Sequence, residues 1–141
     1  MDSTAIRRAG ADDVPAMVRI RAAVRENVLS DPARVPAEAY HGFIDHAGIW
    51  LWEEAGRVLG FTAADPADGT VWALFVDPEA EGRGIGRALL PRALDDLRAA
   101  GWERARLTTQ PGSRAEGFYR LGGWKDAGTA PNGDLVLEKL L

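Results

Sequence analysis

The feature that most constrains this chain is a run near its middle that joins an apolar stretch to an amphipathic helix through a proline and three alternating glycines. The run reads Val76-Asp77-Pro78-Glu79-Ala80-Glu81-Gly82-Arg83-Gly84-Ile85-Gly86-Arg87-Ala88-Leu89-Leu90. Glycine permits tight turns and a close approach of the backbone, and the free N–H groups at a helix N-terminus attract anions. The run therefore predicts a strand–loop–helix unit that holds a phosphate-bearing ligand. The alternative is a glycine-rich turn without a ligand, because glycine motifs are individually weak.

Two common phosphate-binding motifs do not fit the run. A nucleotide triphosphatase loop requires Gly-Lys-Ser/Thr at the helix start, where this chain has Gly86-Arg87-Ala88. A dinucleotide fingerprint requires a third glycine, where Leu89 or Arg87 stands, and too little chain follows for a doubly wound domain. The ligand interpretation that remains is a pyrophosphate on the helix N-terminus, with Arg83 and Arg87 as added cations unless they face solvent.

The rest of the chain predicts alternating helices and strands. Helical spacing follows an Asp N-cap and Pro15, a weaker helix runs from Pro36 to about Ile44, and the helix after the glycines ends at Gly101. A short helix is expected over Arg114–Leu121, and strands over Ser3–Arg8, Ile49–Trp52, Val58–Ala63, Val71–Val76, Arg104–Thr109, Trp124–Gly128 and Leu135–Leu140. This order predicts one three-layer α/β domain over residues 1–141 with a mixed sheet.

Composition excludes several classes of protein. The 141 residues are 46% hydrophobic and 27% charged, and no stretch approaches the ~20 apolar residues of a membrane span. A net charge of −4 argues against a general nucleic-acid surface. The absence of cysteine removes disulfides, thiolate metal sites and a cysteine nucleophile, and two histidines cannot form a histidine-rich metal site. No secretory signal is visible, so a cytoplasmic location is the expectation.

Two blocks of sequence resemble the GCN5-related N-acetyltransferase (GNAT) superfamily. Gly84 and Gly86 match the glycines of its acetyl-CoA signature, Gln/Arg-x-x-Gly-x-Gly/Ala, whereas Glu81 stands at the Gln/Arg position. The segment from Ala115 to Trp124 is similar to the family's Ala-x-x-Phe-Tyr-x-x-x-Gly-Phe, with tryptophan in place of the last phenylalanine. Both blocks stand in the expected order and span about residues 71–124.

The resemblance implies an α/β/α fold with a central mixed, mostly antiparallel sheet, and acetyl-CoA as the cosubstrate. It implies main-chain contacts from Phe75 and Val76 to the pantetheine, where the central strand splays from its neighbour. Tyr119 matches the family's general acid for the CoA thiolate, and the alternative is a core tyrosine with a satisfied hydroxyl. The residues implied to hold the pyrophosphate are Gly82, Arg83, Gly84, Ile85, Gly86 and Arg87.

The acceptor side is less defined. The resemblance places the acceptor pocket near residues 21–31, where Arg21, Glu26 and Asn27 are candidate binding residues. The alternative, given equal weight, is that this segment is the end of a helix and a loop without a binding role. The tryptophans that could line the pocket or simply pack are Trp50, Trp52 and Trp72. The general base stays open among Glu26, Glu53, Glu54, His41 and His46.

The expected function is acetyl-CoA-dependent transfer of an acetyl group to the primary amine of a small molecule, by direct attack on the thioester. The acidic balance loosely favours a cationic acceptor. The alternatives are a protein lysine or N-terminal acetyltransferase and a non-catalytic acyl-CoA-binding module. No metal, nucleic acid or membrane is expected as a partner, and because family members are often dimers, a homodimer is a further expectation.

Overall fold

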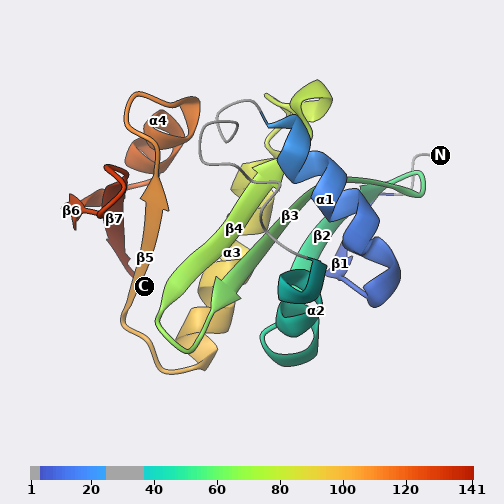
Figure 1. The fold of residues 1–141 in the computed structure, drawn as a ribbon, viewed down its shortest axis with the longest axis horizontal. Coiled ribbons are helices and arrows are strands. Elements are labelled where there is room, and N and C mark those ends of the chain that lie inside the picture. Colours follow the sequence, from blue (N-terminus) through green and yellow to red (C-terminus); the bar gives the residue numbers. More distant parts are fainter. Residues whose placement is uncertain (1–3, 25–36) are drawn as a thin grey trace.

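A mixed seven-stranded sheet organises the computed structural model, which describes residues 4–24 and 37–141 (Figure 1). The sheet order is β1-β2-β3-β4-β5-β7-β6, and only β4 and β5 are parallel neighbours. The strands are β1 (Thr4–Arg8), β2 (Ile49–Glu54), β3 (Arg57–Asp65), β4 (Thr70–Val76), β5 (Arg104–Thr109), β6 (Lys125–Thr129) and β7 (Leu135–Leu140). The predicted mixed, mostly antiparallel sheet is confirmed.

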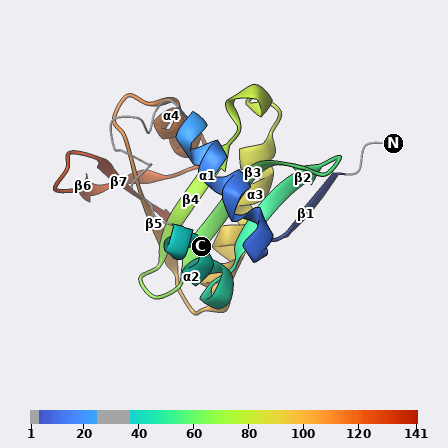
Figure 2. The same cartoon turned by 45° about the vertical axis from the view of Figure 1, so that its right-hand side comes forward.

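Helices cover both faces of this sheet (Figures 1 and 2). The short η1 (Ala11–Asp13), α1 (Val14–Ala23) and α2 (Ala37–His46) lie on one face, and α3 (Ile85–Ala99) lies on the other. The short η4 (Pro78–Ala80) precedes α3, and α4 (Arg114–Leu121) lies beside β5. None of the described helices combines the length and apolar character needed to cross a bilayer.

Strand alternation divides the core into two sides. On β2, Ile49 and Leu51 are fully buried beneath α1 and α2, whereas Trp50 and Trp52 pack on the side of α3. Successive side chains of a strand point to opposite faces, so a continuous apolar run such as this one is buried from both sides. The three-layer architecture follows from these two apolar faces.

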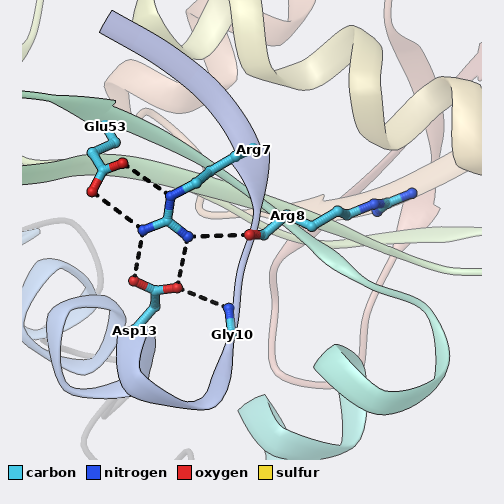
Figure 3. Close-up of polar contacts among 5 residues, drawn as sticks. All are labelled: Arg7, Arg8, Gly10, Asp13 and Glu53. Carbon is cyan, nitrogen blue, oxygen red and sulfur yellow. Dashed lines mark hydrogen bonds and ion pairs between the residues drawn. The ribbon is translucent and has the colours of Figure 1, made fainter. Parts of the chain in front are cut away.

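The start of α1 is fastened to the sheet by a polar cluster, which Figure 3 shows. The Arg7 guanidinium donates to both Asp13 oxygens at 2.9 and 3.0 Å and to both Glu53 oxygens at 3.0 and 3.3 Å. Asp13 also accepts the Gly10 N–H at 2.8 Å and makes no side-chain bond to the first turn of α1. Asp13 is the N-cap residue of α1, but the prediction that its carboxylate accepts hydrogen bonds from the first turn of the helix is wrong. The carboxylate accepts from the Arg7 guanidinium and the Gly10 N–H instead.

This cluster predicts a specific pH dependence of stability. The hydrogen bonds from Arg7 lower the pKa values of Asp13 and Glu53. A carboxylate with a lowered folded-state pKa stabilises the fold above its unfolded pKa, near 4, and loses that contribution as pH falls through the lower folded value. Arg7→Met should lower the melting temperature by a few degrees at pH 7, and this deficit should shrink below about pH 4. Thermal unfolding across pH 2–7 measures it.

The matched control for this prediction is Arg98→Met. Arg98 pairs with Asp95 at 2.7 Å, and both side chains are more than half exposed. Exposed pairs contribute little to stability, so this variant should match the parent protein at every pH. An Arg7→Met deficit that stayed constant down to pH 2 would assign the loss to packing rather than to the ion pairs.

Candidate functional site

An opening in the sheet between β4 and β5 is the centre of the candidate site. The two strands are paired only where Thr70 faces Arg106, next to a hydrogen bond from the Arg106 N–H to the Gly69 oxygen at 3.1 Å. Beyond this point they diverge toward the end of β4 (Figure 1). Beyond Thr70, the main-chain groups on that edge of β4 therefore have no strand partner in β5, as the predicted splay requires.

The pairing of β4 with β3 decides which main-chain N–H and C=O groups of β4 face this opening. The Asp77 N–H donates to the Leu59 oxygen of β3 at 2.8 Å. Amides of alternate residues point to opposite sides of a strand, so Phe75 directs its N–H and C=O toward β3, whereas Leu74 and Val76 direct theirs toward β5. The placement supports the prediction for Val76 and does not support main-chain contacts from Phe75. It adds Leu74, which sequence analysis missed because the phase depends on the pairing with β3.

The glycine run continues from the end of β4 into α3 as predicted. Gly82 and Gly84 have φ angles of +79° and +82°, a conformation that glycine adopts without strain. Gly84 is the N-cap residue of α3 and accepts the Ala88 N–H at 3.0 Å. The N–H groups of Ile85, Gly86 and Arg87 have no acceptor within the described ranges, as is usual for the first turn of a helix. These converging donors fit a pyrophosphate.

The charged side chains around this loop are mostly occupied by other residues. Arg83 donates to both oxygens of Glu54 on β2 at 2.6 and 2.9 Å, so a phosphate contact from Arg83 would have to compete with that carboxylate. Glu81 pairs at 2.6 Å with Arg114, the first residue of α4. The unusual acidic residue of the signature is thus neutralised by a cation. Arg87 is exposed, and the Ile85 side chain is buried, so Ile85 can offer only its amide.

Tyr119 lies on α4 with a ring that is almost fully buried. The ring contacts Phe118 and Trp124 edge to face, with centroids 5.4 and 5.7 Å apart. Burial raises the pKa of the phenol, so it stays protonated at neutral pH. Burial is the only cause that acts on this pKa, so no charged side chain among the described residues stabilises a phenolate. The phenol can therefore donate a proton to a ligand.

Of the acceptor candidates, the structure describes only Arg21; Glu26 and Asn27 lie outside the described residues. Arg21 lies on α1 with its Cζ 4.6 Å from the centroid of the Phe75 ring. The three tryptophans do not share one cleft, because Trp50 and Trp52 pack on the side of α3 and Trp72 on the side of α1 and α2. Trp72 stacks on Phe43 with centroids 4.0 Å apart.

Two of the candidate general bases are held in ion pairs. Glu53 is bound by Arg7 and Glu54 by Arg83, and these contacts lower the pKa values of both carboxyls. A carboxylate that is stabilised by a cation is a weaker base, so neither residue suits proton abstraction. His41 and His46 are exposed on α2, and Glu26 lies outside the described residues.

Comparison with curated proteins finds acetyltransferases. The chain is 38% identical over 88 residues to mycothiol acetyltransferase from Beutenbergia cavernae, covering 58% of this chain and 30% of the relative. It is 38% identical over 84 residues to chloroplastic serotonin N-acetyltransferase 2 from Oryza sativa subsp. japonica, covering 54% and 40%. It is 32% identical over 94 residues to peptidyl-lysine N-acetyltransferase YiaC from Escherichia coli, covering 60% and 61%. The chain thus spans less than two thirds of the length of these relatives.

Solved structures share the fold over nearly the whole chain. An N-acetyltransferase from Staphylococcus aureus Mu50 superposes with a TM-score of 0.78 at 24% identity, covering 98% of both chains. The yncA protein from Salmonella typhimurium, solved with its cofactor acetyl-CoA, superposes with a TM-score of 0.76 at 18% identity, covering 98% of this chain and 94% of that one.

The sequence profile of one family covers most of the site. The profile of the acetyltransferase (GNAT) family matches residues 16–123, which include most of α1, the β4–β5 opening, the glycine run and Tyr119. The resemblance inferred from two short blocks is confirmed over three quarters of the chain. The chain belongs to the acetyltransferase (GNAT) family.

Proposed function

We propose that this protein is an acetyl-CoA-dependent N-acetyltransferase that acetylates the primary amine of a small molecule. The observation that carries this proposal is the opening between β4 and β5, which ends at the glycine loop. One edge of the opening offers the Val76 amide, and the loop offers the amides of Ile85, Gly86 and Arg87. A chain of main-chain donors of this kind suits a long ligand that has a carbonyl at one end and a pyrophosphate further along.

The chemistry follows from where the donors lie. Acetyl-CoA supplies the acetyl group as a thioester. The Val76 N–H donates to the carbonyl oxygen as negative charge develops on it, while the neutral amine forms the new C–N bond. The C–S bond breaks and leaves a thiolate, to which the Tyr119 hydroxyl donates its proton. The attacking nitrogen gives up its proton to water or to a base, and solvent returns one proton to the Tyr119 oxygen, so the products are the amide and the CoA thiol.

A protein acceptor is the second candidate, and one relative favours it. YiaC is by name a peptidyl-lysine acetyltransferase, and the chain spans 61% of its length. Thiol release measured over a panel of amines, amino acids and lysine peptides discriminates between the two candidates. Turnover of peptides with no turnover of small amines would overturn the small-molecule assignment, and no turnover with any acceptor would favour a non-catalytic acyl-CoA-binding module.

Binding of the donor gives a prediction that does not depend on the acceptor. Acetyl-CoA at 100 times its Kd should stabilise the native protein by about 2.7 kcal/mol and raise the melting temperature by several degrees. ATP at the same concentration serves as the control, because it carries phosphates and adenine without the pantetheine arm. Equal shifts with the two ligands, or none with acetyl-CoA, would contradict the proposed function.

A further inference from the structure

Arg21 has an environment that is unusual for a cation. Its Nε and Nη1 atoms are buried and have no hydrogen-bond partner among residues 4–24 and 37–141. Burial lowers the pKa of the guanidinium, and the Tyr40 hydroxyl interacts with it and partly offsets this effect. Buried charges in proteins are normally paired, because an unpaired buried charge costs free energy. Arg21 therefore has unused capacity to bind an anion.

The aromatic surroundings hold this guanidinium in place. Its Cζ lies 4.6 Å from the Phe75 ring centroid and 5.9 Å from that of Trp72, distances at which cation–π attraction acts. The Tyr40 ring contacts Trp72 edge to face at 5.4 Å. The rings limit the freedom of the side chain, so little entropy remains to be lost when a ligand binds.

The helix that carries Arg21 is fixed to the donor end of the site. Two residues before Arg21 on α1, Arg19 donates to Asp77 at 3.2 Å and to the Val58 oxygen at 3.3 Å. Asp77 is the residue after Val76 in the chain, and Phe75, whose ring contacts Arg21, is the residue before Val76. The guanidinium thus lies on the α1 face of β4, beside the residue whose amide faces the thioester in the proposed function.

We propose that Arg21 binds a carboxylate of the acceptor, so that the acceptor is an amino acid or a similar amino-carboxylic acid. This inference rests on the proposed function and names its substrate class. Carboxylate oxygens form strong, charge-assisted bonds with guanidinium N–H groups. A single guanidinium among aromatic rings balances one carboxylate, whereas a phosphate dianion would keep an uncompensated buried charge. The acidic net charge of the chain loosely favoured a cationic acceptor. The Arg21 guanidinium lies nearer to the proposed acceptor than most of those charges, so it has the larger effect on which acceptor binds.

The test compares acceptors that differ only in the carboxylate. Several α-amino acids are each paired with their amide and with the decarboxylated amine, for example tryptophan, tryptophanamide and tryptamine. The parent protein should show a kcat/KM at least tenfold higher for the acid of the preferred set. Arg21→Gln should abolish this preference by raising KM for the acid at least tenfold more than KM for the amide and the amine.

Arg92→Gln is the matched control, because Arg92 also lies over an aromatic ring, 5.0 Å from the Trp50 centroid, but on the side of α3. It should keep the preference for the acid. Equal kcat/KM for acid and amide in the parent protein, or an equal loss for both in Arg21→Gln, would overturn the proposal. Preference for a phosphorylated amine over every carboxylate would also overturn it.

A second measurement separates a binding role from a structural one without turnover. Arg21→Met removes two buried nitrogen atoms that have no partner among the described residues, and it also removes the contact with Tyr40, so the melting temperature should not fall. N-acetylated amino acids, added with CoA, should stabilise the parent protein more than their amides do, and this difference should vanish in the variant. A lower melting temperature with the difference intact would make Arg21 structural and refute the proposal. Failure of acetyl-CoA to bind the parent protein would refute the proposed function instead.

Discussion

Tyr119→Phe is expected to lower kcat by about 10²-fold while the affinity for acetyl-CoA stays unchanged. The substitution removes only the hydroxyl and keeps the ring contacts with Phe118 and Trp124. The melting temperature should therefore stay within a degree or two of the parent value. Thiol release at saturating substrates measures kcat, and the thermal shift with acetyl-CoA measures binding.

The pH profile of this variant adds a further check. Burial raises the pKa of the phenol above its ordinary value near 10, so the hydroxyl is protonated throughout the neutral range. The ratio of parent to variant kcat should then be constant from pH 6 to 9. Full activity in Tyr119→Phe would remove the residue from the mechanism. Equal losses of kcat, acetyl-CoA affinity and stability would show a packing role instead.

Gly84→Ala is expected to weaken acetyl-CoA binding at least tenfold, which corresponds to 1.4 kcal/mol. Gly84 has a φ of +82° at the N-cap of α3, and an added Cβ would meet no atom within 4 Å. No clash therefore disturbs the free protein. The cost arises because an L-residue resists the left-handed conformation by about 1–2 kcal/mol, and relaxing that strain turns the amides of Ile85 and Gly86 away from the phosphate.

Gly101→Ala is the matched control, since Gly101 follows the other end of α3 with a φ of +93° and equally open space around its Cα. Both variants should lose several degrees of melting temperature, but only Gly84→Ala should lose affinity for acetyl-CoA. Calorimetric titration of the two variants decides the matter. Equal Kd values in the two would mean that the loop amides do not bind the pyrophosphate.

Local sequence patterns predicted most of the fold and the place of the glycine loop before α3. The strand–glycine–helix unit, the alternation of Ala105 and Leu107 on β5, and the stop of α3 at Gly101 each depend on neighbours within a few residues. Such patterns act through backbone conformation and periodicity, which a single sequence displays directly. The two short blocks around Gly84 and Tyr119 accordingly sufficed to indicate the family.

Side-chain partners were less predictable, because they come from segments far apart in the chain. Asp13 binds Arg7 instead of capping α1, Arg83 binds Glu54 of β2, and Glu81 binds Arg114 of α4. Each long cation can reach several carboxylates, and sequence spacing does not distinguish among them. Glu53 and Glu54 were equal candidates for the base until their arginine partners were known.

By itself, the sequence determined that this chain forms a three-layer α/β fold with a glycine loop at the start of α3, because those features follow from local backbone preferences and apolar periodicity. Only the tertiary structure decided that Leu74 and Val76, rather than Phe75, direct their amides into the β4–β5 opening, since this depends on the register with β3. It also decided that the half-buried Arg21 lies over Phe75 with Nε and Nη1 unsatisfied among the described residues. Burial and strand phase are properties of the assembled layers, and no single segment encodes them.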